Sequence, residues 1–154
     1  MILFLDFDGV MHPFGCTIDL YFCRLELLET WLRRRPGFDV VISSSWREVH
    51  PLDEMRSYFS DDVQLRVIDS TPILGRDDWA QYGGEPPPLR FEREMEIREW
   101  LRSSGEPWRP WVAVDDQAWL FKPFCDRLVV VDGSVGLTGR DLDAVDHVLQ
   151  RGVR

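Results

Sequence analysis

The chain has 154 residues, of which 44% are hydrophobic, enough apolar side chains for one compact core. Its formal net charge of −9 argues against a broad basic surface for duplex nucleic acid or for an anionic membrane. No apolar run reaches the roughly 20 residues of a membrane helix, and no signal-peptide pattern opens the chain, so we expect a cytoplasmic protein with no membrane partner and one domain over residues 1–154.

Five short apolar runs are typical of strands that are buried on both faces of a sheet. In chain order they cover residues 2–6, 39–43, 64–69, 111–115 and 127–132. Helical patterns separate these runs. The first places Leu20, Cys23, Leu27 and Trp31 on one face and ends before Pro36.

Further helices are expected over residues 48–60, 91–103 and 139–151, the last with Thr138 as a candidate N-cap. The alternation of strands and helices predicts an α/β fold. We expect a single Rossmann-like three-layer domain with a mostly parallel five-stranded sheet.

Polar residues gather where the predicted strands end. They are Asp6 and Asp8 after the first strand, Ser43, Ser44 and Ser45 at the end of the second, and Asp115 and Asp116 at the end of the fourth. In open parallel sheets, ligands bind beyond the carboxyl ends of the strands. We therefore expect the four carboxylates to converge there.

Four carboxylates at one edge repel one another and lose water, so the cluster requires a cation. Mg²⁺ is the natural candidate, because it prefers oxygen ligands and is held by carboxylates, waters and substrate phosphate. Beside such an ion, Asp6 could attack phosphorus, and Asp8 could protonate the leaving oxygen and later accept a proton from water. Gly9 would let the chain turn sharply beside an anion.

Four motifs of the sequence resemble those of haloacid-dehalogenase-like (HAD-like) hydrolases. They are DFDGV at 6–10, the serines in VVISSSWRE, a basic residue on a later helix, and VAVDD at 112–116. Two finer features, RxxEIxxWL at 93–101 and GLT at 136–138, are similar to the HAD domains of Swiss-Army-knife RNA-repair proteins. The resemblance covers nearly the whole chain and implies a magnesium-dependent phosphatase that forms an aspartyl-phosphate.

The resemblance also implies roles for the acidic residues. Asp6 would be the nucleophile and a metal ligand, and Asp8 would be the acid/base with its main-chain carbonyl on the metal. Asp116 would meet Mg²⁺ directly, and Asp115 would support it.

The phosphate-binding residues follow from the second and third motifs. Ser44 with Ser45 is our assignment for holding the transferring phosphoryl group, and Ser43 is the alternative. The third motif usually supplies a lysine, but here the helix from 91 offers only arginines. Arg93 is the best match and Arg90 the alternative. The competing interpretation of Arg93 is an exposed helix residue on a solvated surface.

Three ring-bearing residues flank the motifs. For Trp46 and Trp119, packing in the core or at the rim fits better than stacking on a substrate, because a chain with seven tryptophans must bury many of them. His12 has two interpretations, either contact with a leaving group or a solvent-facing position in a loop.

The intervals between the motifs leave no room for a full cap domain. Residues 11–38 provide a short flap and one helix, and the loop at 70–90 is the candidate for a local lid. The resemblance therefore implies an open rim, which admits a phosphate on a large substrate or is closed by a partner subunit.

The resemblance implies hydrolysis of a phosphomonoester, and the narrower resemblance, together with the aromatic residues, suggests a nucleotide or a nucleic-acid end as the substrate. A small phosphorylated metabolite is the alternative substrate, because an acidic chain offers few cations to nucleic-acid phosphates. A non-catalytic phosphate-binding or regulatory module is the alternative class of protein. Steady Mg²⁺-dependent phosphate release would distinguish the enzyme from the module.

Overall fold

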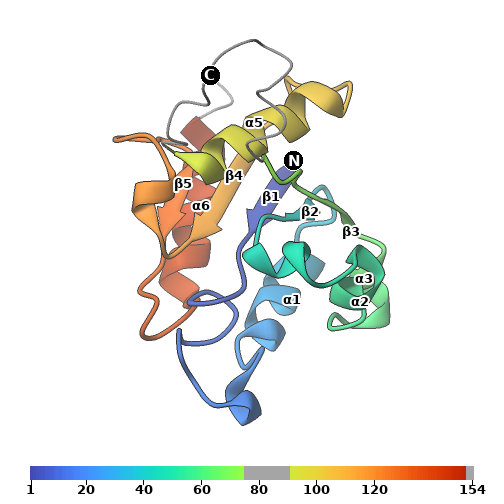
Figure 1. The fold of residues 1–154 in the computed structure, drawn as a ribbon, viewed down its shortest axis with the longest axis vertical. Helices are drawn as coiled ribbons and strands as arrows, with labels where there is room; N and C mark the ends of the chain where they lie inside the picture. Colours follow the sequence, from blue (N-terminus) through green and yellow to red (C-terminus); the bar gives the residue numbers. More distant parts are fainter. Residues whose placement is uncertain (75–90, 152–154) are drawn as a thin grey trace.

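The computed structural model describes residues 1–74 and 91–151 and contains a five-stranded sheet in the order β3-β2-β1-β4-β5 (Figure 1). The strands are β1 (Ile2–Leu5), β2 (Asp39–Ile42), β3 (Val67–Ser70), β4 (Trp111–Asp115) and β5 (Leu128–Val130). Every neighbouring pair is parallel. The predicted α/β fold with a five-stranded Rossmann-like sheet is confirmed.

The helices lie between the strands, as the alternation predicts. They are η1 (Ile18–Leu20), α1 (Leu25–Arg33), η2 (Ser45–Glu48), α2 (Leu52–Arg56), α3 (Asp61–Gln64), α5 (Glu92–Ser103), η3 (Ala118–Leu120) and α6 (Gly139–Arg151). Two expected helices begin later than predicted. α1 does not include Leu20, because Phe22 has φ 58, outside the right-handed helical region. α2 begins only after Pro51, which serves as its N-cap.

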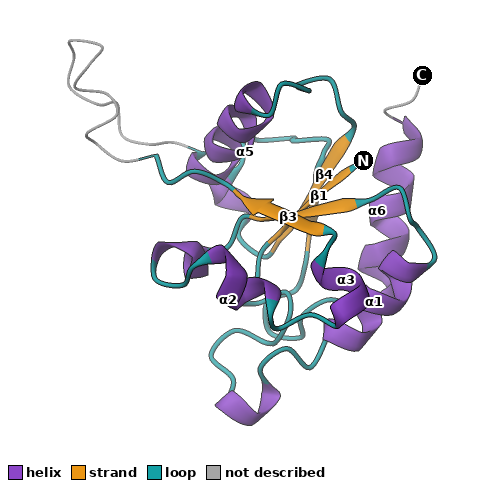
Figure 2. Cartoon of the chain, turned by 90° about the vertical axis from the view of Figure 1, so that its right-hand side faces the viewer, coloured by secondary structure: helices purple, strands orange, loops and turns teal. Residues whose placement is uncertain are grey.

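Successive side chains of β1 pack on opposite faces of the sheet. Leu3 and Leu5 join a core that includes residues of α1 and α6, whereas Ile2 and Phe4 join a second core with residues of α5. Figure 2 shows α5 on one side of the sheet and α1 and α6 on the other. Both faces of the sheet are therefore covered, and the ends of the strands remain as the place for a site.

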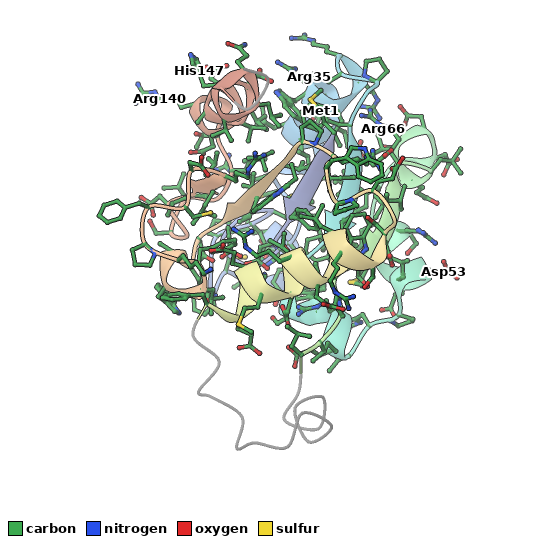
Figure 3. All side chains as sticks on the ribbon, turned by 90° about the horizontal axis from the view of Figure 1, so that it is seen from above. Met1, Arg35, Asp53, Arg66, Arg140 and His147 are labelled. Carbon is green, nitrogen blue, oxygen red and sulfur yellow. The ribbon has the colours of Figure 1, made fainter. Side chains whose placement is uncertain are left out.

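The amino-terminal edge of the sheet is closed by hydrogen bonds to backbone carbonyls. Arg66, just before β3, donates to the carbonyls of Leu32, Arg35 and Phe38, and the amino group of Met1 donates to Gly37 at 2.7 Å. Figure 3 shows Met1, Arg35 and Arg66 near one another. This edge is held by structural contacts, opposite the edge where the predicted site residues lie.

The segment that joins β1 to β2 contains only η1 and α1, as the short interval predicts. The lid expected over 70–90 falls mostly outside the described residues. Within the part of the chain that the structure describes, no helix is long and apolar enough to cross a membrane.

Candidate active site

The register of the sheet brings three predicted residues to one edge. Around the central strand, the register pairs Leu5 of β1 with Ile42 of β2 and with Val114 of β4. One position further along, Asp6, Ser43 and Asp115 follow on adjacent strands, with the Asp6 amide bound to the carbonyl of Val114 at 3.2 Å. Parallel pairing thus places residues from distant parts of the sequence side by side.

Three of the four predicted carboxylates converge. Asp6, Asp115 and Asp116 each offer a carboxylate oxygen, and these oxygens lie within 4.8 Å of one another. Asp6 and Asp115 are buried, and Asp116 is half-buried. The acidic cluster therefore sits at the end of β1 and β4, where the sequence predicts it.

Arg93 of α5 lies against this acidic cluster. Its Nη1 is 3.3 Å from Asp6 Oδ1 and 3.2 Å from Asp115 Oδ2, and its side chain is buried. The interpretation of Arg93 as an exposed helix residue is therefore wrong. Arg90, the alternative, lies outside the described residues.

The charges in the cluster do not balance. Burial, and then the charge of Asp6, raise the pKa of Asp115 to about 7, and the same two causes raise the pKa of Asp116. Burial opposes the positive charge of Arg93, but Asp115 and Asp6 outweigh it, so the pKa of Arg93 is raised. One guanidinium faces three carboxylates, and the surplus negative charge calls for a proton or a further cation.

The surroundings of Asp116 fit such a cation. Its Oδ1 is buried and has no hydrogen-bond partner among residues 1–74 and 91–151. A Cβ atom on either Gly9 or Gly133 would overlap Asp116 Oδ2, so two glycines make room for this carboxylate. Carboxylate oxygens grouped this closely are the ligands that Mg²⁺ prefers. The residues present therefore fit the expected metal.

Asp8 lies outside the three-carboxylate group and has its own partners. His12 Nε2 is 3.0 Å from Asp8 Oδ1, and Trp46 Nε1 donates to Asp8 Oδ2 at 2.9 Å. The Asp8 side chain is 34% exposed, so it faces solvent while both oxygens are held. Its main-chain contact with a metal, implied by the resemblance, stays a prediction.

The three ring side chains beside the motifs differ in their exposure to solvent. His12 is buried, which makes the solvent-facing interpretation wrong. Trp46 packs on the core as expected, whereas Trp119 is 70% exposed, contrary to the packing we expected. Trp119 belongs to η3, a short 3-10 helix with no buried residue.

The serines after β2 are held by an arginine. Ser43 and Ser44 are buried and Ser45 is exposed. Arg47 Nη1 donates to the carbonyls of Ser43 and Ser44 at 3.0 and 2.7 Å, and Nη2 is paired with the buried Glu96 of α5. The serine segment is thus fixed to the same helix that supplies Arg93.

Sequence reasoning missed three residues of this site. Arg47 and Glu96 form its supporting ion pair, and Gly133 makes room for Asp116. A signal was present for Glu96, because it follows Arg93 by three residues and so shares its helix face. Gly133 follows the fifth strand within an Asp-Gly pair that sequence alone reads as a turn.

The parallel sheet with acidic residues at the ends of β1 and β4, a serine after β2 and a buried basic residue on α5 define a HAD-like domain. Residues 2–142 match the sequence model of the family described as the HAD domain in Swiss Army Knife RNA repair proteins. The chain belongs to this family, as the motifs predict. No curated protein and no solved structure gives a significant match.

Proposed function

We propose that this chain is a magnesium-dependent phosphatase that hydrolyses a phosphomonoester through an aspartyl-phosphate on Asp6. Membership of a HAD family supports phosphatase activity in general. The observation that carries the proposal is the convergence of Asp6, Asp115 and Asp116 beside a buried Arg93, with one Asp116 oxygen lacking any partner among the described residues.

Asp6, Asp116 and the main-chain carbonyl of Asp8 would hold Mg²⁺, with Asp115 in support, and the ion would neutralise charge on the phosphoryl oxygens. Ser44 and Ser45 would bind these oxygens through a hydroxyl and an amide. Arg93 would add positive charge from the α5 side.

The reaction then proceeds in two steps. A carboxylate oxygen of Asp6 forms a bond to phosphorus while the bond to the leaving oxygen breaks, and Asp8 gives its proton to that oxygen. In the second step Asp8 takes a proton from water, the water oxygen bonds to phosphorus, and the bond to Asp6 breaks. Inorganic phosphate and free Asp6 are the products.

The proposed substrate is a nucleotide or a nucleic-acid end that carries a phosphomonoester. The support is the family description, which refers to RNA repair, together with a β1–β2 segment too short for a cap domain. A terminal phosphate needs few cationic contacts along a duplex, which agrees with a net charge of −9.

Phosphate release from para-nitrophenyl phosphate tests the enzyme class. The wild-type chain should turn over repeatedly with Mg²⁺ and stop when EDTA is added, and Asp6→Asn should lower kcat by about a thousandfold or more. Binding of phosphate without turnover would favour the regulatory module. A panel of nucleotides, sugar phosphates and 3′- or 5′-phosphorylated oligonucleotides then identifies the substrate class.

A further inference from the structure

Both carboxylate oxygens of Asp8 are held by ring N–H groups. The partners are His12, four residues later in the same loop, and Trp46, which belongs to η2. The distances of 3.0 and 2.9 Å are those of ordinary hydrogen bonds. An aspartate that is one-third exposed and has two dedicated donors is fixed in one orientation.

The surroundings of His12 determine which of its nitrogens carries the proton. The amide of Phe22 donates to Nδ1 at 3.4 Å, so Nδ1 is an acceptor and Nε2 bears the hydrogen that faces Asp8. The ring is 1% exposed and stacks on Tyr21 at 4.5 Å with an interplanar angle of 16°. His12 is therefore held as a donor to Asp8.

Trp46 is fixed by its neighbours in a similar way. Its ring makes edge contacts with Phe7 and Phe22, both at 5.6 Å, and with Tyr58 at 6.0 Å. It follows Ser44 by two residues. The segment assigned to phosphate binding thus also supplies a donor to Asp8.

Resting on the proposed function, we infer that His12 and Trp46 are positioning residues that hold Asp8 for proton transfer to the leaving group. Each carboxylate oxygen has two lone pairs, so one N–H contact on each leaves room for the transferred proton. When Asp8 releases that proton it becomes an anion, and hydrogen bonds to a carboxylate are stronger than those to the neutral acid. The two donors therefore hold Asp8 in a fixed geometry, and they also favour the departure of the leaving group.

The rival explanation is that the hydrogen bonds merely satisfy a buried histidine and a tryptophan. The two explanations differ in how activity depends on the leaving group. A basic leaving oxygen needs the proton from Asp8, whereas para-nitrophenolate departs almost without it. A purely structural defect would slow both reactions equally.

The test compares kcat/KM for phenyl phosphate and para-nitrophenyl phosphate, two substrates of nearly the same shape. His12→Phe keeps a ring and removes the donor, and Trp46→Phe does the same on a different element. Each should lower kcat/KM for phenyl phosphate by about tenfold to a hundredfold and that for para-nitrophenyl phosphate by less than about threefold. His12→Gln, which restores an N–H donor, should recover most of the loss.

Tyr58→Phe is the matched control, because Tyr58 packs on Trp46 in the same cluster and its hydroxyl donates to Glu54 rather than to Asp8. It should leave the ratio of the two kcat/KM values unchanged. Equal losses on both substrates, or no loss on either, in the His12 and Trp46 variants would overturn the inference while the wild type remains active. A wild-type chain inactive on both substrates with Mg²⁺ would instead overturn the proposed function, and this inference with it.

Discussion

The position of the Asp116 carboxylate depends on two glycines. Gly9 has φ +73, so an alanine there would be strained whatever the space. Gly133 has no such backbone requirement, and its hydrogen faces Asp116 directly. Gly133 is therefore the cleaner position at which to displace this carboxylate.

Gly133→Ala should weaken Mg²⁺ binding and phosphatase activity by about tenfold or more, because its Cβ would push Asp116 away from the other carboxylates. Isothermal titration calorimetry with Mg²⁺ measures the binding. The matched control is Gly139→Ala at the start of α6, where a Cβ meets no atom within 4 Å. Equal Mg²⁺ affinity in the two variants would contradict the role given to Gly133.

The raised pKa of Asp115 predicts how Mg²⁺ binding depends on pH. In the folded chain Asp115 keeps its proton up to about pH 7, whereas in the unfolded chain it keeps the proton only to pH 3.8. Without Mg²⁺, the folded state therefore loses stability as the pH rises through that window. Mg²⁺ competes with the proton for the cluster. The rise in Tm caused by Mg²⁺ should therefore be larger at about pH 8 than at about pH 5.5. A rise that is the same at both pH values would contradict binding of the ion in competition with the Asp115 proton.

Site residues could be predicted from the sequence where neighbours in the chain form one motif. A strand that runs into Asp6-x-Asp8-Gly9 or ends in Asp115-Asp116 carries its own signal. Arg47 and Gly133 were not predictable, because their roles depend on which segments meet across the carboxyl edge of the sheet.

At the scale of elements, a buried ion pair joins η2 to α5. The side chains of Arg47 and Glu96 are only 4% and 2% exposed, and Arg47 also donates to the carbonyls of Ser43, Ser44 and Thr71. Burial opposes the charges of both partners and, for Glu96, raises the pKa. Such a pair contributes more to the relative position of two elements than to stability.

Arg47→Met should lower the free energy of unfolding by about 3–5 kcal/mol, because it leaves the Glu96 carboxylate buried without its partner. Urea denaturation measures this change. Asp53→Asn, which breaks an exposed ion pair with Arg56 on α2, is the control and should cost about 0–1 kcal/mol. The double variant Arg47→Met with Glu96→Met should lose less than Arg47→Met alone, and an equal or larger loss would contradict this explanation.

The kinds of elements were predictable, but the bounds of only some of them were. The predicted helix over 139–151 matches α6, where Thr138 donates to Asp141 at 2.6 Å just ahead of the helix. The helix expected over 48–60 is reduced to α2, since Pro51 sets its start and the chain turns before α3. The left-handed backbone of Phe22 has no signal in the sequence, because it follows from tertiary packing.

For the whole molecule, the two ends of the sheet differ in their chemistry. The amino-terminal edge is closed by Arg66 and Met1, which bind backbone carbonyls, and the carboxyl edge carries the acidic cluster. Alternating strands and helices predict this division, because parallel strands place all their carboxyl ends together. The identity of the substrate is not encoded in that architecture, since it depends on the groups at the rim.

Trapping the covalent intermediate tests the central claim most directly. The chain is mixed with substrate and Mg²⁺, quenched in acid, and mapped by peptide mass spectrometry. We predict one phosphoryl group on Asp6, formed with Mg²⁺ and missing when EDTA is present. A phosphoryl group on any other residue, or one formed equally without Mg²⁺, would contradict the account.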